Sequence, residues 1–281
     1  MKYFGAIDQG TTSSRFIVFN ENGNIISQHQ QEFKQYLPNE VSVEHDPIEI
    51  WESVKNCINE VDKNFSISHL SSIVITKQTQ TTLAWSKSTG KPLFNALVWQ
   101  DTRTQDICDE LKKIKNLSSQ FSKTGLPIAT YFSLSKILWL IRNVDEVKKA
   151  AANNDLCFGT IDSWLLFKLT GNHVTDVTNA SRTLLMDLKT LQWMEEILIE
   201  LDIPKNSCKD FSFNLIFFNL VVSNFLTAFL HTLDISFSKN RMVVENCHFK
   251  SGDDYLLLSG SWLSKNKYRI DRIQSAYKDN Y

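Results

Sequence analysis

One turn near the N-terminus constrains the fold of this chain more than any other stretch. Two apolar runs, Tyr3–Ile7 and Phe16–Phe19, flank it and predict an antiparallel hairpin. Between them stands a segment with a carboxylate, a glycine, four hydroxyls and an arginine, Asp8-Gln9-Gly10-Thr11-Thr12-Ser13-Ser14-Arg15. Backbone amides and hydroxyls can bind phosphate, Arg15 can add charge-assisted hydrogen bonds, and Asp8 can hold Mg²⁺ directly or through water. Since such turns also occur as plain hairpins, the loop alone leaves both interpretations open.

Composition narrows the classes of protein to consider. The formal net charge of -1 over 281 residues provides no basic surface, so nucleic acid is not an expected partner. No long apolar core follows the N-terminus, so no signal peptide is expected and the prediction is a cytoplasmic protein. The five cysteines are widely spaced and form no CxxC pair, which favours a reducing compartment over a disulfide framework: Cys57, Cys108, Cys157, Cys208 and Cys247.

The hydrophobic pattern predicts an α/β fold. Residues 3–35 indicate three antiparallel strands, and Asn22-Gly23 supplies the second hairpin turn. Asp46-Pro47 is typical of a helix start. Further elements are expected as a buried strand at Ser71–Thr76, strands at Thr82–Trp85 and Leu93–Trp99, and helices from Asp101, over Phe132–Val144 and over Val147–Ala152. Hairpins followed by alternating strands and helices predict a mixed sheet with helices on its faces.

Isolated polar residues receive ordinary interpretations. His45 and His173 stand in polar surroundings without a neighbouring metal-ligand pattern, which favours surface or loop positions. Asp162 and Asp176 lie near the starts of elements, where capping is the expected role.

Six stretches in the same order resemble the FGGY carbohydrate kinases, and within them the glycerol kinases. The stretches are Ala6–Arg15, Val43–Pro47, Thr89–Trp99, Tyr131–Ser133, Phe158–Leu165 and Thr175–Thr183. The resemblance extends over residues 3 to about 204. It implies a ribonuclease-H-like, actin-like ATPase domain, of which two close around ATP and a polyol and transfer the γ-phosphoryl group to glycerol.

The resemblance also implies roles for individual residues. Thr11, Thr12, Ser13 and Arg15 correspond to the loop that binds the nucleotide phosphates, and Asp8 to the carboxylate near Mg²⁺. Trp99 and Tyr131 correspond to residues that line the glycerol pocket, where an aromatic wall suits the carbon backbone of a polyol. Without the resemblance, both would be taken as core aromatics.

The same comparison exposes a departure at the substrate site. The family has Asn-Gln-Arg-Glu-Thr-Thr where this chain has Lys77-Gln78-Thr79-Gln80-Thr81-Thr82. Thr79 and Gln80 therefore replace the charged pair that grips the glycerol hydroxyls. Losing such partners in a desolvated site costs about 1–3 kcal/mol each, so weak or altered polyol binding is expected.

Beyond Pro204 the family pattern ends. The family's Gly-Asp-Gln motif, whose Asp is the general base, and its second ATPase domain are not recognisable, so the expected organisation is a kinase N-terminal domain at 1–207 and an atypical tail at 208–281. The tail holds eight of the eighteen phenylalanines. Three interpretations stay open for it: translated noncoding sequence, a packed soluble segment, or a membrane span at 211–230, against which three asparagines argue.

Two functions follow from this organisation. The first is a glycerol kinase-like enzyme with impaired turnover. The second is a non-catalytic pseudokinase that acts by binding a partner, such as a full-length relative or a second copy.

Overall fold

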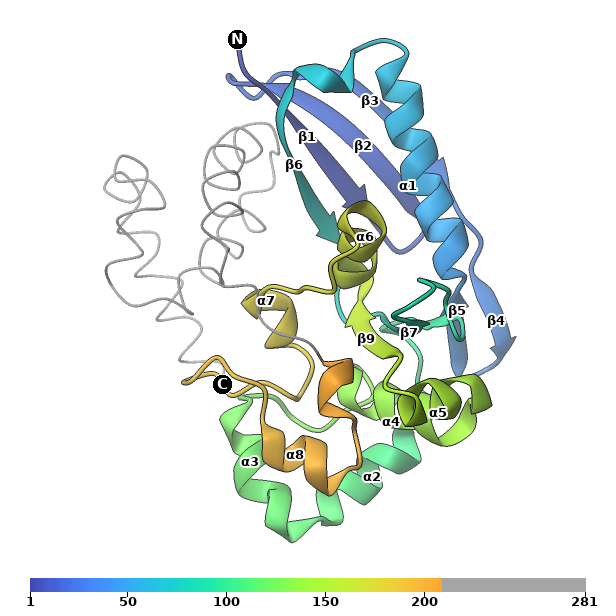
Figure 1. Ribbon diagram of the computed structural model, residues 1–281, viewed down its shortest axis with the longest axis vertical. Helices are drawn as coiled ribbons and strands as arrows, with labels where there is room; N and C mark the ends of the chain where they lie inside the picture. Colours follow the sequence, from blue (N-terminus) through green and yellow to red (C-terminus); the bar gives the residue numbers. More distant parts are fainter. Residues whose placement is uncertain (209–281) are drawn as a thin grey trace.

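The computed structural model describes residues 1–208, and its upper part is a four-stranded mixed sheet (Figure 1). The strand order is β3-β2-β1-β6. The strands are β1 (Tyr3–Gln9), β2 (Ser13–Asn20), β3 (Ile25–Glu32) and β6 (Leu70–Lys77). The antiparallel register of β1 and β2 sets Asp8 opposite Arg15, and the parallel pairing of β1 with β6 sets Gln9 beside Lys77. The functional candidates of the first turn thus lie at one end of this sheet.

Local sequence signals explain the first elements. Gly23 takes a φ of 83° in the second hairpin turn, where the Asn20 Oδ1 accepts from the amides of Asn22 and Asn24, each at 3.0 Å. Helix α1 (Pro47–Asp62) begins after Asp46, whose carboxylate accepts from the Ile48 amide at 2.7 Å. Both predictions from the sequence are confirmed.

The remaining strands form a second, antiparallel sheet in the order β4-β5-β8-β7-β9. They are β4 (Tyr36–Asn39), β5 (Ser42–His45), β7 (Thr82–Ser86), β8 (Ala96–Leu97) and β9 (Leu156–Thr160). The mixed α/β class is confirmed, but the strands divide between two sheets. The chain turns after β6 through Gln80, whose φ of 65° is left-handed, and β7 then pairs with β8 and β9 instead of extending the first sheet.

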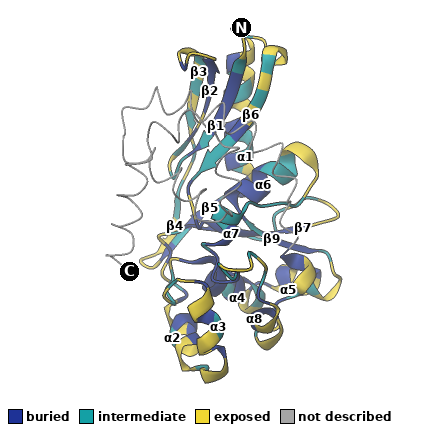
Figure 2. Ribbon diagram, turned by 90° about the vertical axis from the view of Figure 1, so that its left-hand side faces the viewer, coloured by how far each residue is buried: buried dark blue, intermediate teal, exposed yellow. Residues whose placement is uncertain are grey.

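Helices enclose two apolar cores (Figure 2). They are α2 (Gln105–Lys113), α3 (Ser118–Lys123), α4 (Ser133–Asn143), α5 (Asp145–Ala152), α6 (Ile161–Thr170), α7 (Val177–Ala180) and α8 (Glu195–Glu200), with short 3₁₀ turns at Ile67–His69, Lys115–Leu117 and Lys205–Ser207. Side chains of α2 to α5 and α8 build one core on the second sheet. The other lies between α1, the first sheet and α6, and α6 contacts β6, β7 and β9, so it joins the two sheets.

Three expectations about elements were wrong in detail. Only Ala96–Leu97 of the expected strand 93–99 is a strand, and α2 begins at Gln105 instead of Asp101. Asp101 is fully buried, and its carboxylate accepts from the Val43 amide at 2.8 Å and pairs with Arg103. The strand expected to be buried at 71–76 is β6, which lies at the edge of its sheet and leaves Ile73 38% exposed.

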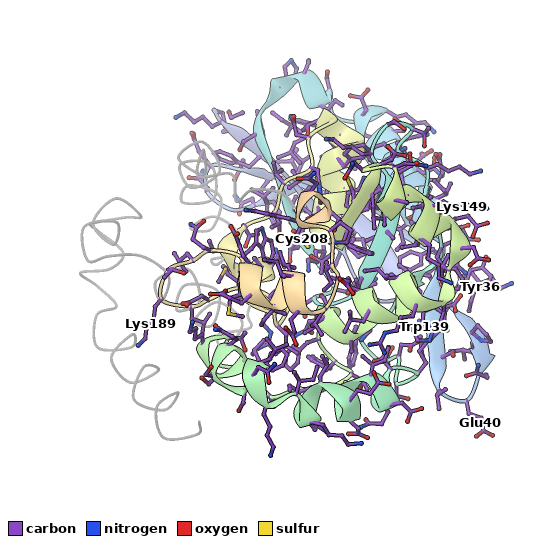
Figure 3. The ribbon with its side chains drawn as sticks, turned by 60° about the horizontal axis from the view of Figure 1, so that its bottom comes forward. Tyr36, Glu40, Trp139, Lys149, Lys189 and Cys208 are labelled. Atoms are coloured by element: carbon purple, nitrogen blue, oxygen red, sulfur yellow. The ribbon has the colours of Figure 1, made fainter. Side chains whose placement is uncertain are left out.

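The described part of the chain ends at Cys208, which lies in the interior (Figure 3). Within residues 1–208, no helix is long and apolar enough to cross a membrane. The segment 211–230 and Cys247, about which the sequence raised expectations, lie outside the described residues.

Candidate functional site

The turn between β1 and β2 is tightly held but leaves donors free. The Gly10 amide donates to the Ser13 carbonyl at 2.8 Å, and the Ser13 hydroxyl accepts from the Gln30 amide on β3 at 3.0 Å. Within residues 1–208, the backbone amides of Thr11 and Thr12 have no hydrogen-bond acceptor. A turn that presents free amides and hydroxyls can bind an anion such as phosphate.

Asp8 and Arg15 are paired with each other across the base of this turn. The Arg15 Nη2 lies 2.7 Å from the Asp8 Oδ2, and the two side chains are 43% and 31% exposed. The sequence suggested separate tasks for the two residues. In the structure the guanidinium lies against the carboxylate, so Asp8 would share its oxygens between Arg15 and any metal.

The two aromatic candidates meet at one edge of the same turn. The rings of Trp99 and Tyr131 contact edge to face with centroids 5.6 Å apart. The Trp99 Nε1 donates to the Thr11 Oγ1 at 3.4 Å. Trp99 is half-buried and Tyr131 is 38% exposed, so the pair forms a wall open to solvent instead of a part of the core. The chain therefore brings the predicted acceptor wall and the predicted phosphate loop into direct contact.

A buried glutamine behind this wall connects it to β1. The Gln78 amide nitrogen of the backbone donates to the Gln9 carbonyl at 2.7 Å, and the Gln78 Oε1 accepts from the Thr81 hydroxyl at 3.1 Å. That hydroxyl in turn accepts from the Trp99 backbone amide at 3.3 Å. Gln78 had no predicted role, and only its position between Lys77 and Thr79 in the family-like run could have indicated one.

His45 contradicts its expected surface position. Its side chain is fully buried at the end of β5, with the Nδ1 3.2 Å from the Gln78 Nε2 and the ring against Phe33. Burial lowers the pKa of His45 from 6.5 to about 4. His45 is therefore neutral at physiological pH and serves as a hydrogen-bond partner beneath the site.

Thr79 and Gln80, which replace the charged pair of the family, lie at the predicted acceptor site. Thr79 is exposed, whereas Gln80 is 2% exposed and lies between the Tyr131 hydroxyl and the guanidinium of Arg182. The guanidinium of Arg182 also lies over the Phe132 ring, with its central carbon 5.0 Å from the ring centroid. The sequence did not single out Arg182, although it belongs to one of the family-like stretches. A charged residue inside such a stretch was the available signal.

A buried lysine holds the loop that carries Tyr131. The Lys136 ammonium on α4 is fully buried and donates to the carbonyl of Thr130. Burial lowers the pKa of Lys136 to about 8, against the opposing charge of Asp101. The neighbouring Arg103 completes a buried network by pairing with Asp101 at 2.8 Å and with Glu44 at 2.7 Å.

The expected caps have different outcomes. Asp176 is confirmed as the cap of α7, since its carboxylate accepts from the amides of Thr178 and Asn179. Asp162 was wrongly expected to be a cap: it is 5% exposed and pairs with the buried Lys77 ammonium at 3.2 Å. That pair fixes the end of β6 to the start of α6.

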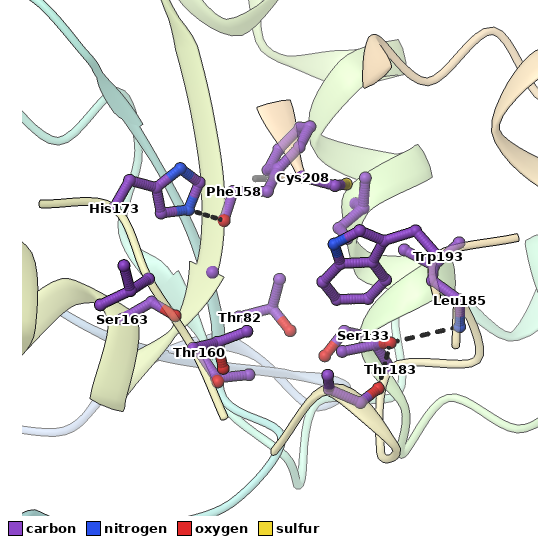
Figure 4. Close-up of a pocket in the computed structure, with 15 residues that line it drawn as sticks. Thr82, Ser133, Phe158, Thr160, Ser163, His173, Thr183, Leu185, Trp193 and Cys208 are labelled. Carbon is purple, nitrogen blue, oxygen red and sulfur yellow. Dashed lines mark hydrogen bonds between the residues drawn. The ribbon is translucent and has the colours of Figure 1, made fainter. Parts of the chain in front are cut away.

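His173 and Cys208 line a separate small cavity (Figure 4). Its volume is about 30 Å³, which is room for water molecules but not for a polyol or a nucleotide. The half-buried His173 lies in the loop after α6 and donates from Nε2 to the Phe158 carbonyl at 2.7 Å, so of the expected surface or loop position the loop is confirmed and full exposure is not. This cavity is therefore too small to be the candidate site. The candidate site remains the turn between β1 and β2 with the wall formed by Trp99 and Tyr131.

Comparison with known proteins identifies the fold. Residues 3–215 match the model for the FGGY family of carbohydrate kinases, N-terminal domain. The chain belongs to this family.

Within the family, the similar proteins include glycerol kinases. Glycerol kinase of Borreliella afzelii is 52% identical over 209 residues, which cover 73% of this chain and 42% of the relative. Glycerol kinase of Arabidopsis thaliana is 51% identical over 215 residues, covering 72% and 41%. The chain thus spans about two fifths of the length of the curated relatives it matches.

A solved structure shows the same fold. The crystal structure of Plasmodium falciparum glycerol kinase with ADP matches at a TM-score of 0.67 and 40% identity, over 73% of this chain and 41% of that one. The predicted actin-like ATPase domain of an FGGY kinase is therefore confirmed.

Proposed function

We propose that residues 1–207 are the N-terminal domain of a glycerol kinase-type phosphotransferase, which moves the γ-phosphoryl group of ATP to glycerol or a similar polyol. In this proposal Thr11, Thr12, Ser13 and Arg15 bind the nucleotide phosphates. Thr79, Gln80, Trp99 and Tyr131 face the acceptor. An ATP-consuming reaction of this kind is expected in the cytoplasm.

One observation carries the proposal: the Trp99 indole donates to the Thr11 hydroxyl at 3.4 Å. Phosphoryl transfer depends mainly on holding the acceptor hydroxyl and the phosphate in line and on stabilising the charge between them. Because the aromatic wall and the phosphate loop share this hydrogen bond, an acceptor at the wall and a nucleotide phosphate at the loop would lie side by side. The free Thr11 and Thr12 amides supply donors for the phosphate oxygens.

Mg²⁺ would arrive with the nucleotide. Within residues 1–208, no three His, Cys, Asp or Glu side chains form a metal-binding group. This fits Mg²⁺ better than a protein-caged metal, because Mg²⁺ usually takes one or two carboxylates and completes its shell with phosphates and water. Asp8 is the carboxylate at the turn that fits this part, and Mg²⁺ would neutralise charge on the phosphates.

A second function is favoured by the hydrogen bonds of Gln80. Its amide is occupied by Thr79, Tyr131 and Arg182, so little of it is left to grip a glycerol hydroxyl. Slow turnover is therefore expected, and a pseudokinase that binds a full-length relative or a second copy is the alternative function.

The deciding assay measures glycerol 3-phosphate formed from ATP, Mg²⁺ and glycerol by the full chain. Turnover that depends on glycerol and falls in Trp99→Phe, which removes the indole donor but keeps a ring, supports the kinase. Nucleotide binding without any turnover supports the pseudokinase. A chain that binds neither Mg²⁺-ATP nor glycerol would contradict the proposal.

A further inference from the structure

The side-chain amide of Gln80 is fully occupied by its neighbours. Its Oε1 accepts from the Arg182 Nε and Nη2, each at 2.8 Å, and its Nε2 donates to the Thr79 Oγ1 at 3.0 Å and the Tyr131 hydroxyl at 3.3 Å. This is the orientation that satisfies both ends of the amide. Two N–H donors and two lone pairs are the whole capacity of the group. Gln80 therefore acts as a brace between the acceptor wall and Arg182.

The backbone at Gln80 is constrained as well. Its φ of 65° is in the left-handed region, which a residue with a Cβ enters at a cost. Such conformations persist where the surroundings hold them, and they concentrate at functional sites. The brace is thus a fixed feature of the site, and Arg182 is held in one place beside Tyr131.

Arg182 differs from the other arginines of residues 1–208 in its partner. Arg15, Arg103 and Arg142 each pair with a carboxylate at 2.7 Å. In this same part of the chain, no Asp or Glu oxygen lies within 4.0 Å of Arg182, whose bonded partner is the neutral Gln80 amide. The guanidinium is half-buried over the Phe132 ring, where its charge is less screened than at an open surface.

A carboxylate is the natural partner for this group. A guanidinium has five N–H donors, of which Gln80 takes two, so donors remain for a second acceptor. Charge-assisted bonds from arginine to a carboxylate are stronger than those to a neutral hydroxyl. An uncharged polyol leaves the positive charge of Arg182 without an anionic partner, whereas a ligand with a carboxylate supplies that partner.

We propose that Arg182 makes this site select a small polyol that carries a carboxylate, a sugar acid, over an uncharged polyol such as glycerol. This inference rests on the proposed function, because it takes the Trp99 and Tyr131 wall as the acceptor site. Arg182 is then the specificity-determining residue, and Gln80 positions it.

Calorimetry on the full chain with Mg²⁺ and a non-hydrolysable ATP analogue tests the preference, with glycerol, D-glycerate and D-gluconate as separate ligands. At low salt, one of the two acids is expected to bind about tenfold more tightly than glycerol. The advantage should shrink as salt is raised, because screening weakens the ion pair. This comparison needs no variant.

Gln80→Glu supplies the missing carboxylate from the protein. It should pair with Arg182 and remove the preference for the acid over glycerol. Gln105→Glu, the same change at an exposed position on α2, is the matched control and should leave the preference unchanged. Far-UV circular dichroism and thermal unfolding establish that both variants fold.

The outcomes separate this inference from the proposed function. Glycerol binding as tight as that of both acids, or an acid preference that survives in folded Gln80→Glu, would overturn the inference and leave the kinase proposal standing. If Mg²⁺-nucleotide binds but neither glycerol nor acid does, the acceptor half of the proposed function fails and the inference fails with it.

Discussion

At the scale of single residues, the Asp8–Arg15 pair offers a test that separates binding from stability. Both side chains are partly exposed, so their ion pair contributes less than about 1 kcal/mol. Asp8→Asn should therefore unfold near the wild-type temperature. Its affinity for Mg²⁺-ATP should fall about 10–100-fold, because in the proposed function Asp8 holds the metal or its water.

Differential scanning fluorimetry and calorimetry measure the two quantities. Asp145→Asn, which breaks the exposed pair with Lys148 on α5, is the control. Unchanged Mg²⁺-ATP affinity in Asp8→Asn would remove Asp8 from the metal site.

His45 makes stability depend on pH. Its pKa is about 4 in the folded protein against an ordinary 6.5. Because the unfolded chain binds the proton more readily, the stabilisation is complete above pH 6.5 and is lost as pH falls toward 4. The loss from this group at pH 5 is about 2 kcal/mol.

Urea unfolding at pH 7.5 and 5.0 measures this loss of stability. His45→Asn should lose less stability between the two pH values than the wild type, by about that amount. His69→Asn, at an exposed histidine, should behave as the wild type does. An identical pH dependence in His45→Asn and the wild type would show that His45 does not titrate in this way.

At the scale of elements, α6 is the connection between the two sheets. Trp164 on α6 is fully buried, lies 5.6 Å from the ring of Trp85 on β7, and donates from Nε1 to the Pro47 carbonyl at 3.0 Å. One side chain thus contacts the second sheet and the start of α1. Removing it should weaken both halves together.

Trp164→Ala is expected to cost about 3–5 kcal/mol, as for other large side chains deleted from a core. Urea unfolding followed by near-UV and far-UV circular dichroism should show a single transition at lower urea. Trp51→Ala, at a half-buried tryptophan on α1, should cost less. Two separated transitions in Trp164→Ala would mean that the sheets unfold independently.

At the scale of the whole molecule, the sequence predicted what depends on neighbouring residues. The β1–β2 hairpin, the Gly23 turn and the Asp46 cap are set by local periodicity and by side chains within a few positions, so they were predictable. The family match added Trp99 and Tyr131, which the structure places together.

What the sequence did not reveal depends on partners far along the chain. His45 contacts Phe33 and Gln78, and Asp162 forms an ion pair with Lys77, so neither environment follows from adjacent residues. The contact between Gln80 and Arg182 joins positions about a hundred residues apart. The division into two sheets likewise rests on which strands pair, and hydrophobic pattern alone cannot choose the partner.

In the proposed kinase, the Thr11 hydroxyl has a consequence for the order in which the two substrates bind. A hydroxyl can accept one hydrogen bond while donating another, and each bond strengthens the other. Thr11 already accepts from the Trp99 indole, so its own proton is available for a phosphate oxygen. A nucleotide phosphate that accepts a hydrogen bond from the Thr11 hydroxyl would strengthen the bond that this hydroxyl accepts from the Trp99 indole. We therefore expect the acceptor to bind more tightly after the nucleotide than before it. Trp99 would couple the two sites, because it lines the acceptor site and is hydrogen-bonded to the phosphate loop.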